Sequence, residues 1–214
     1  MAINFLIPLL KTKVYNFLHS KILYRFGYGA SVQKGVWEKQ YKGTAWDFLF
    51  SEDEKEHYLA IITQLQNYTT NSKILDIGCG RGALYHYFQK SLSGDFSYTG
   101  IDISENAIKK ATDQFPGVDF KTINYDSETI DDRFDAVVFN EVFYYFIKPM
   151  KTLKKAFSEN ISANGVAIIS MYEDATGKNK LLWNAIAEEY SILNEVTVSN
   201  TKGTTWTVKT IKRK

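Results

Sequence analysis

The sequence has little of several features that mark common protein classes. A single cysteine, Cys79, occurs in 214 residues, which excludes an intrachain disulfide and a cysteine zinc cluster and suits a reducing, cytoplasmic setting. The formal net charge is only +2, too small to indicate a nucleic-acid-binding surface. No run of about 18 apolar residues is present, so we expect no transmembrane helix. The first ten residues lack the charged start and small-residue cleavage site of a signal peptide.

The composition is that of an ordinary globular protein. Hydrophobic residues make up 44% of the chain, and this length accommodates one α/β domain with a modest appendage. Aromatic residues reach 15%, which suits either a pocket for an organic molecule or a bulky core. Because no repeat, linker or low-complexity tract is evident, we predict a single domain.

One stretch, residues 73–84 (KILDIGCGRGAL), organises the rest of the chain. It opens as a short apolar run typical of a buried strand and continues through Gly78, Gly80 and Gly82. A helical pattern begins at Leu84. A strand, a glycine turn and a helix start together let the backbone approach a ligand closely, with helix N–H groups pointing at it.

Two acidic residues narrow the choice of ligand. The glycine spacing also fits a dinucleotide fingerprint, with Ala83 as its third small residue. Asp76, however, would repel the pyrophosphate of NAD and would suit a cationic group. Asp102 follows the glycines by about 20 residues, where an acid binds ribose. A ribose with a cationic tail indicates S-adenosylmethionine, and the stretch resembles the first motif of the class I S-adenosylmethionine-dependent methyltransferases.

Apolar runs alternate with helical patterns after the glycine stretch. Strands are predicted at 73–77, 97–102, 118–123, 133–139 and 166–170, helices at 84–92, 104–115, 151–160 and 178–190, and a final hairpin at 195–200 and 204–211. This order predicts an open, mostly parallel sheet with an antiparallel C-terminal hairpin. The resemblance implies the same α/β fold, Rossmann-like with seven strands.

The first part of the chain reads as an N-terminal helical cap. Residues 3–25 carry apolar side chains at helical spacing with basic residues between them, a pattern that fits peripheral contact with an anionic membrane, a cover for the core or a lid. Ser51 and Glu54 match a capping box before a helix predicted at 51–65. We predict a cap at residues 1–45 and a methyltransferase domain at residues 46–214.

The carboxyl ends of the predicted strands mark the binding site, because ligands of open α/β sheets lie there. Asp102 can accept ribose hydroxyls, and Ile103 can pack on an adenine ring. The resemblance implies that Asp126 and the backbone of Ser127 bind adenine, although Asp126 also fits a plain loop turn. It further implies that Asn140 contacts the methionine moiety. With Asp76, Gly78, Cys79 and Gly80 of the glycine stretch, these residues form the predicted cofactor site, and no metal site is predicted.

A narrower resemblance lies on either side of these motifs. Residues 139–146 (FNEVFYYF) resemble the E-V-x-Y-Y segment of the nodulation N-methyltransferases, and Trp46-Asp47-Phe48 with Ser51 and Glu54-Lys55 resembles a pattern ahead of their first motif. The resemblance runs from about Trp46 to Ser170. It implies methyl transfer to an amine of a small molecule such as an amino sugar.

Glu141 is the leading candidate for orienting the acceptor or taking its proton, because it follows the fourth strand at the ligand edge. Tyr144 and Tyr145 are further candidates that also fit a core role, and Glu141 also fits the start of a helix. His57 shares a predicted helix with Lys55 and Glu56, which indicates a solvated surface position.

Other functions stay open on the sequence alone. The leading prediction is a small-molecule N- or O-methyltransferase, whose acceptor is an amine or a hydroxyl. An RNA methyltransferase is a second reading, although the D-P-P-Y segment of amino-methylating DNA enzymes is replaced by N-E-V-F at 140–143, and the basic tail at 212–214 is short. A third is a non-catalytic S-adenosylmethionine-binding partner subunit. A fourth is an NAD-dependent oxidoreductase, for which the chain after residue 165 is short.

Overall fold

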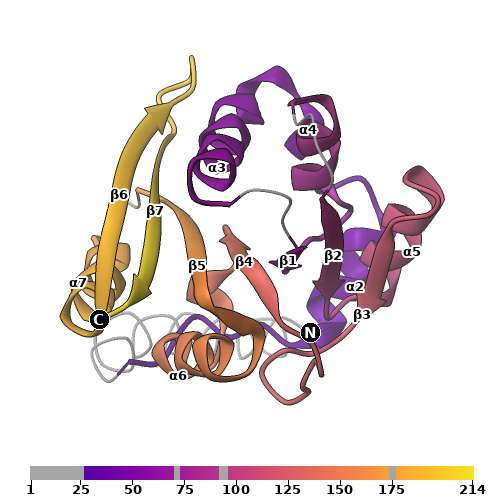
Figure 1. Ribbon diagram of the computed structural model, residues 1–214. Coiled ribbons are helices and arrows are strands. Elements are labelled where there is room, and N and C mark those ends of the chain that lie inside the picture. The colour runs from indigo at the N-terminus through magenta and orange to yellow at the C-terminus, as the bar shows by residue number, and fades with distance from the viewer. Residues whose placement is uncertain (1–26, 70–72, 92–95, 174–176) are drawn as a thin grey trace, which may run out of the picture.

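The computed structural model describes residues 27–69, 73–91, 96–173 and 177–214. Its centre is a seven-stranded sheet with the strand order β3-β2-β1-β4-β5-β7-β6 (Figure 1). The strands are β1 Lys73–Ile77, β2 Ser97–Asp102, β3 Asp119–Thr122, β4 Phe134–Asn140, β5 Ile161–Tyr172, β6 Tyr190–Ser199 and β7 Thr205–Arg213.

The sheet is parallel through its first five strands and antiparallel at one edge. β1 pairs in parallel with β2 on one side and β4 on the other, whereas β7 runs antiparallel to both β5 and β6. The prediction of a Rossmann-like, seven-stranded sheet with an antiparallel C-terminal hairpin is confirmed. The order reverses at β1, which places a topological switch point between β1 and β4.

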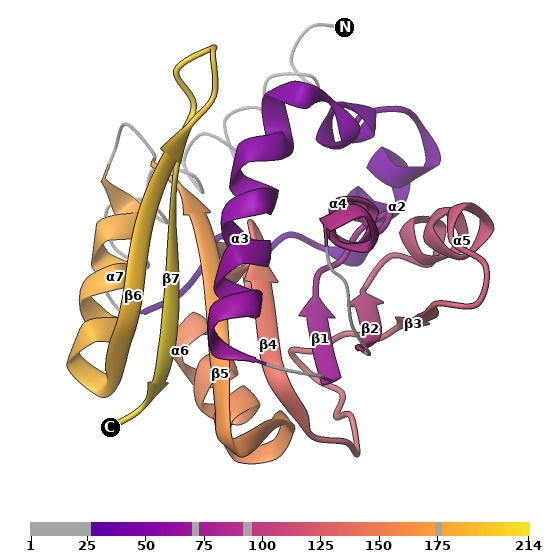
Figure 2. The ribbon, with the colours of Figure 1, turned by 45° about the horizontal axis from the view of Figure 1, so that its top comes forward.

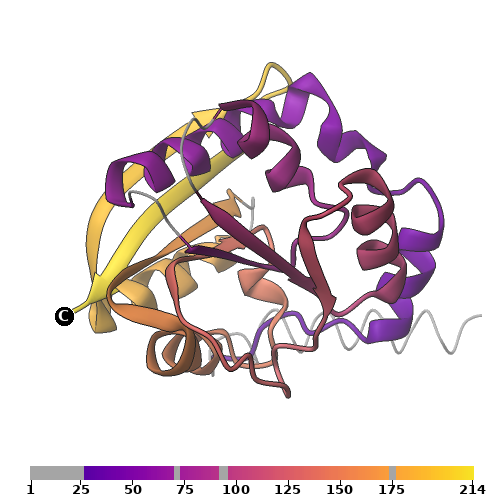
Figure 3. The ribbon, with the colours of Figure 1, turned by 45° about the vertical axis from the view of Figure 1, so that its right-hand side comes forward.

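Helices cover both faces of the sheet. Helices α3 and α4 lie on one face and α6 and α7 on the other, as Figure 2 shows and the differently turned view of Figure 3 repeats. The helices are α2 Lys34–Lys42, α3 Lys55–Tyr68, α4 Ala83–Ser91, α5 Glu105–Gln114, α6 Pro149–Lys155 and α7 Lys178–Glu189, with short turns η2 Asp47–Phe50, η3 Glu52–Glu54, η4 Phe143–Tyr145 and the π-helical η5 Ala156–Asn160.

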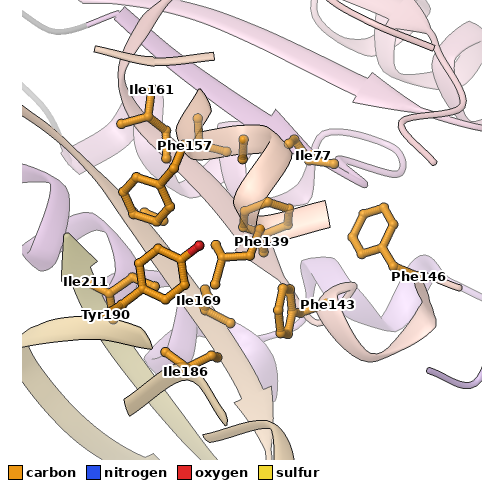
Figure 4. Close-up of a cluster of buried hydrophobic side chains, with 14 of the residues drawn as sticks. Ile77, Phe139, Phe143, Phe146, Phe157, Ile161, Ile169, Ile186, Tyr190 and Ile211 are labelled. Atoms are coloured by element: carbon orange, nitrogen blue, oxygen red, sulfur yellow. The ribbon is translucent and has the colours of Figure 1, made fainter. Parts of the chain in front are cut away.

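Burial on both faces explains the near-continuous apolar sequence of β4. Along this strand Val137 and Val138 are fully buried in different clusters, one on each face. The cluster on the α6 and α7 face is rich in aromatic rings: Figure 4 shows Phe139 beside Phe143 and Phe157 beside Tyr190. The abundant aromatic residues of the sequence therefore lie in the core as well as in the site described below.

Two strands are longer than predicted. β5 begins at Ile161 rather than residue 166. The segment that we predicted as a turn is part of the strand, because the pairing of β5 with β4 continues past a register shift between Phe134 and Ala136. β6 begins at Tyr190, directly after α7, five residues before the predicted start. Both extensions begin with pairing to a residue more than 20 positions away in a neighbouring strand, which local turn signals do not report.

Of the two predicted helix caps, one is correct and one is wrong. Ser104 caps α5 as expected, because its Oγ accepts a hydrogen bond from the Ala107 N–H. The capping box of Ser51 and Glu54 is wrong: neither side chain makes a cap hydrogen bond, and a turn of 3-10 helix precedes α3. The helix predicted at 151–160 is α6 followed by the π-helical turn η5.

Part of the predicted N-terminal cap lies outside the described residues. This holds for residues 1–26, and with them for the predicted membrane contact of residues 3–25. Within the described part, α2 packs against α5, and the Glu38 carboxylate accepts hydrogen bonds from the Glu105 and Asn106 N–H groups. The division at residue 46 stays a prediction. Among the described helices, none has the length and apolar character of a membrane span.

Candidate active site

A cavity of about 1080 Å³, counted out to its open mouth, lies beyond the carboxyl ends of the parallel strands. In Figure 2 the arrowheads of β1, β2 and β4 point toward α2, which supplies part of its wall. Among the described residues that line the cavity, four are carboxylates and none is Lys, Arg or His. The four are Asp76, Asp102, Asp126 and Glu141. The cavity is therefore suited to a ligand with cationic or hydrogen-bond-donating groups.

The glycine loop after β1 is held in a conformation that only glycine adopts readily. Gly78 has a φ of 77° and Gly80 a φ of 54°. A Cβ on Gly80 would lie 2.6 Å from the Tyr41 hydroxyl oxygen. The N–H groups of Gly78 and Cys79 both donate to the Ile101 carbonyl oxygen, at 2.8 and 2.9 Å. The predicted strand, glycine turn and helix are therefore present, and the loop is anchored to β2.

Asp102 holds two loops of the site together. Its Oδ2 accepts a hydrogen bond from the Gly80 N–H at 2.9 Å, and its Oδ1 accepts one from the Ser104 N–H at 2.8 Å. Burial raises the pKa of the carboxyl to about 6, against the opposing effect of these hydrogen bonds. Each carboxylate oxygen has a second lone pair. Asp102 can thus accept a ribose hydroxyl while it fixes the glycine loop.

Two acceptor atoms at the cavity lack a partner within the described part of the chain. They are Asp76 Oδ1 and Asn140 Oδ1, both buried. The other Asp76 oxygen, Oδ2, accepts a hydrogen bond from the Tyr98 hydroxyl at 2.5 Å. Burial raises the Asp76 pKa to about 7, opposed by the Tyr98 hydrogen bond and assisted by the negative charge of Asp102. Because buried polar groups are normally satisfied, two such acceptors indicate a ligand with several donors.

An aromatic wall faces the glycine loop. Tyr41 stacks on Trp46 with ring centroids 5.9 Å apart, and Trp37 lies 6.0 Å from Trp46. All three residues line the cavity. The Trp46 Nε1–H is buried and has no acceptor among the described residues. This wall comes from α2 and from the segment that leads into η2.

The residues predicted to contact adenine are only partly at the cavity. Ile103 and Asp126 line it, together with Asn124 and Tyr125. Asp126 is exposed and accepts hydrogen bonds from the Ile147 N–H at 3.2 Å and the Thr152 hydroxyl at 3.4 Å. Ser127 does not line the cavity, and its N–H donates to the Asn124 carbonyl oxygen at 3.0 Å.

Glu141 stands out in its backbone and its surroundings. It has a φ of 54°, in the left-handed region, and no other non-glycine residue of the described ranges has a positive φ. Such strain is retained where the surrounding structure enforces it, often at functional sites. Its Oε2 accepts a hydrogen bond from the Tyr144 hydroxyl at 2.9 Å, and Ser170 Oγ lies 3.4 Å from Oε1. Burial raises the Glu141 pKa to about 8 despite these two donors.

The candidate tyrosines occupy different positions. Tyr145 lines the cavity next to Glu141 and meets Trp37 edge to face at 5.0 Å. Tyr144 is buried behind Glu141 and does not line the cavity. Ser170 was not predicted as a site residue; its only signal was its place at the end of the fifth strand.

The surface position predicted for His57 is wrong. The His57 side chain is fully buried and stacks on Trp206 with ring centroids 4.7 Å apart. Its Nδ1 lies 3.6 Å from Glu54 Oε2, too far for a hydrogen bond, and burial lowers the His57 pKa to about 3. His57 does not line the cavity.

Part of the chain matches a known protein family. Residues 75–167 match a family model described as a methyltransferase domain. The protein 235L of Invertebrate iridescent virus 6, which carries a methyltransferase name, is 35% identical over 116 residues, or 53% of this chain and 41% of that protein. A malonyl-[acyl-carrier protein] O-methyltransferase of Bacillus cereus is 22% identical over 174 residues, or 78% of this chain and 64% of that protein. The chain thus spans less than two thirds of either relative.

Solved structures show the same fold. The N-methyltransferase NodS of Bradyrhizobium japonicum in complex with S-adenosyl-L-homocysteine aligns with a TM-score of 0.70 at 15% identity, over 84% of this chain and 97% of that one. A Burkholderia thailandensis 1,6-didemethyltoxoflavin-N1-methyltransferase with S-adenosylhomocysteine aligns with a TM-score of 0.64 at 16% identity, over 84% of this chain and 86% of that one.

Proposed function

We propose that this chain, whose residues 75–167 match a methyltransferase domain, transfers the methyl group of S-adenosylmethionine to an amine of a small molecule. One observation carries the proposal: a single cavity joins the Asp102 carboxylate to two unpaired acceptors, Asp76 Oδ1 and Asn140 Oδ1. A ribose and a primary ammonium group would satisfy these atoms. S-adenosylmethionine bears both groups, and it also carries the methyl group to be transferred, on a positively charged sulfur.

We assign each part of the cofactor to different residues of the cavity. Asp102 accepts the ribose hydroxyls, while Ile103 and the segment from Asn124 to Asp126 receive adenine. The two unpaired oxygens of Asp76 and Asn140 accept the α-ammonium group. The cavity has no basic side chain among its described lining residues, so the Trp46 Nε1–H is the donor that we assign to the α-carboxylate.

Glu141 and Tyr145 are the acceptor end of the proposed site. With Asp76, Asp102 and Asp126 assigned to the cofactor, Glu141 is the remaining carboxylate among the described residues that line the cavity. In its ionised form Glu141 attracts a protonated amine, orients it and takes a proton from it, while Tyr144 and Ser170 hold the carboxylate in place. Positioning a nucleophile for in-line attack can itself lower the barrier by roughly 7–11 kcal/mol. Little further chemistry is asked of the protein, because the thioether that leaves is neutral.

The discriminating experiment measures S-adenosylhomocysteine release by the purified protein. The acceptor panel contains amino sugars, simple amines, hydroxylated sugars, carboxylic acids and RNA. Turnover on amines supports the proposal, and turnover on hydroxyl or carboxylate acceptors retains methyl transfer but removes the amine assignment. Salt-sensitive turnover on RNA would favour a nucleic-acid methyltransferase instead. Cofactor binding without turnover on any acceptor would favour a non-catalytic partner subunit.

A further inference from the structure

The hydroxyl group of Tyr98 reaches Asp76 across two neighbouring strands. In the parallel register of β1 and β2, Ile74 pairs with Tyr98 and Asp76 pairs with Gly100. Because side chains alternate along a strand, Tyr98 and Asp76 lie on the same face, diagonally opposed. Gly100, the direct partner of Asp76, has no side chain to stand between them. The result is the 2.5 Å hydrogen bond from the Tyr98 hydroxyl to Asp76 Oδ2.

Packing holds the Tyr98 ring in this orientation. Tyr98 is 6% exposed, and its ring lies 5.0 Å from Tyr85, 5.8 Å from Phe88 and 6.1 Å from Phe120, measured between centroids. The hydroxyl therefore has a fixed position. It occupies Oδ2 and leaves Oδ1 as the unpaired oxygen of Asp76 at the cavity.

We propose that Tyr98, which does not itself line the cavity, is a positioning residue that makes Asp76 an acceptor for the cofactor's α-ammonium group. This inference rests on the proposed function, since it assumes that an S-adenosyl amino acid occupies the cavity. Tyr98 acts in two ways. It fixes the rotation of the carboxylate, and it donates to the charged form, which is the form that attracts an ammonium group.

The electrostatic surroundings make this donor necessary. Asp76 is fully buried. Within the described part of the chain, the titratable groups around it are Asp102 on β2, Tyr58 on α3 and Cys79 in the glycine loop, in addition to Tyr98. None of these groups carries a positive charge. Burial and Asp102 favour the protonated carboxyl, and Tyr98 opposes them. Without the Tyr98 hydroxyl, the Asp76 pKa rises further above its ordinary value.

The test compares two ligands over a pH range. S-adenosylhomocysteine carries the α-ammonium group, whereas 5′-deoxy-5′-methylthioadenosine keeps the nucleoside and the sulfur but lacks the amino acid. Their affinities are measured by calorimetry between pH 6 and pH 8.5 for the parent protein and for Tyr98→Phe. Tyr87→Phe is the matched control, because it removes another buried tyrosine hydroxyl, one that donates to the Ser51 carbonyl oxygen rather than to Asp76.

In the parent protein we expect S-adenosylhomocysteine to bind more weakly as the pH falls through about 7, while methylthioadenosine binding stays flat above pH 7 and weakens only toward pH 6, where Asp102 begins to gain a proton. A charge-assisted hydrogen bond corresponds to about one pKa unit or more. Tyr98→Phe should therefore move the midpoint up by about one pH unit and weaken S-adenosylhomocysteine about fivefold at pH 7. Methylthioadenosine affinity should change less than about twofold, and Tyr87→Phe should reproduce the parent profile.

Two outcomes separate this inference from the function on which it rests. Parent-like affinity and midpoint in Tyr98→Phe, with S-adenosylhomocysteine still bound by both proteins, would overturn the role of Tyr98 alone. Equal weakening of both ligands would also overturn it, because it would show a general packing defect. If the parent protein binds neither ligand, the proposed function itself fails.

Discussion

Glu141 combines two features that are each unfavourable by themselves. Its backbone has a positive φ, and its carboxyl group is buried with a raised pKa. Two donors, Tyr144 and Ser170, reach its two oxygens from η4 and β5. A strained, desolvated carboxyl held by dedicated donors at a cavity is typical of a functional group, and not of the helix-start residue that the sequence also allowed.

The first prediction concerns Glu141→Gln. The substitution keeps the shape of the side chain but removes its capacity to take a proton, so kcat should fall by about 10²-fold or more. S-adenosylhomocysteine affinity should change by less than about twofold, because the cofactor contacts lie elsewhere. Steady-state kinetics and calorimetry measure the two quantities. Unchanged turnover would mean that Glu141 is neither base nor anchor for the acceptor.

The same residue predicts a pH dependence. A carboxyl with a pKa of about 8 is mostly protonated at neutral pH and gains its charge as the pH rises. kcat/KM, which reports the free protein, should therefore increase through about pH 8. This limb should be absent in Glu141→Gln when both are measured with one acceptor, which cancels the titration of the acceptor itself. Identical profiles would assign the limb to the acceptor.

Asp102 has a double role that a substitution should expose. Asp102→Asn replaces one acceptor oxygen by a donor, which then faces the N–H of Gly80 or Ser104. Leaving a buried donor unpaired costs about 1–3 kcal/mol, so urea denaturation should show a loss of that size without ligand. Calorimetry should show at least tenfold weaker binding of S-adenosylhomocysteine. A loss of stability with unchanged affinity would contradict the ribose assignment.

At the scale of the element, α3 carries a buried histidine, His57, whose burial the sequence of the helix alone does not predict. His57 is stacked on Trp206 of β7, which is distant in the chain, and neither ring nitrogen has a hydrogen-bond partner among the described residues. A neutral imidazole behaves there as an aromatic ring. The folded chain holds the His57 pKa near 3, against about 6.5 when exposed.

His57→Phe should therefore remove an acid sensitivity. Between pH 6.5 and 3 the unfolded parent chain binds a proton at His57 that the folded chain does not, so its stability falls as the pH falls. The difference in free energy of unfolding between variant and parent should grow, in favour of the variant, by about 2 kcal/mol from pH 7.5 to pH 5. Denaturation at several pH values measures it, and a constant difference would show that His57 is accessible to protons.

At the scale of the whole molecule, the sheet order brings the site together. Asp76 and Asp102 lie at the carboxyl ends of β1 and β2, and Glu141 directly follows β4. The parallel pairing of β1 with both neighbours aligns these strand ends. The segment from α2 to η2 lines the same cavity. A ligand in the cavity therefore contacts segments from across the chain and should stabilise the fold as a unit.

Ligand stabilisation gives a test of the cofactor class. S-adenosylhomocysteine at about 100 times its Kd should add about 2.7 kcal/mol of stability, which corresponds to a rise in Tm of roughly 5–10 °C for a domain of this size. NADH at the same concentration should leave Tm unchanged. Thermal denaturation followed by circular dichroism suffices. The reverse pattern would indicate that the glycine loop binds a dinucleotide.

The sequence alone was sufficient for features that depend on nearby residues. The glycine loop, the Ser104 cap and the alternation of strands and helices are local: each follows from backbone sterics, from one side chain bonding a backbone group three residues away, or from hydrophobic periodicity. The placement of Asp76 and Asp102 at strand ends followed from the same patterns. The fold class and the position of the cavity were accordingly predictable.

Other features were decided only by tertiary structure. The Tyr98 hydroxyl reaches Asp76, Ser170 lies beside Glu141, and His57 is buried against Trp206. Each contact joins residues more than 20 positions apart in different elements. Its formation depends on strand register, on the space left by a neighbour such as Gly100, and on which helix face is covered. These quantities arise only when the whole chain is packed, because no local segment contains both partners of the contact.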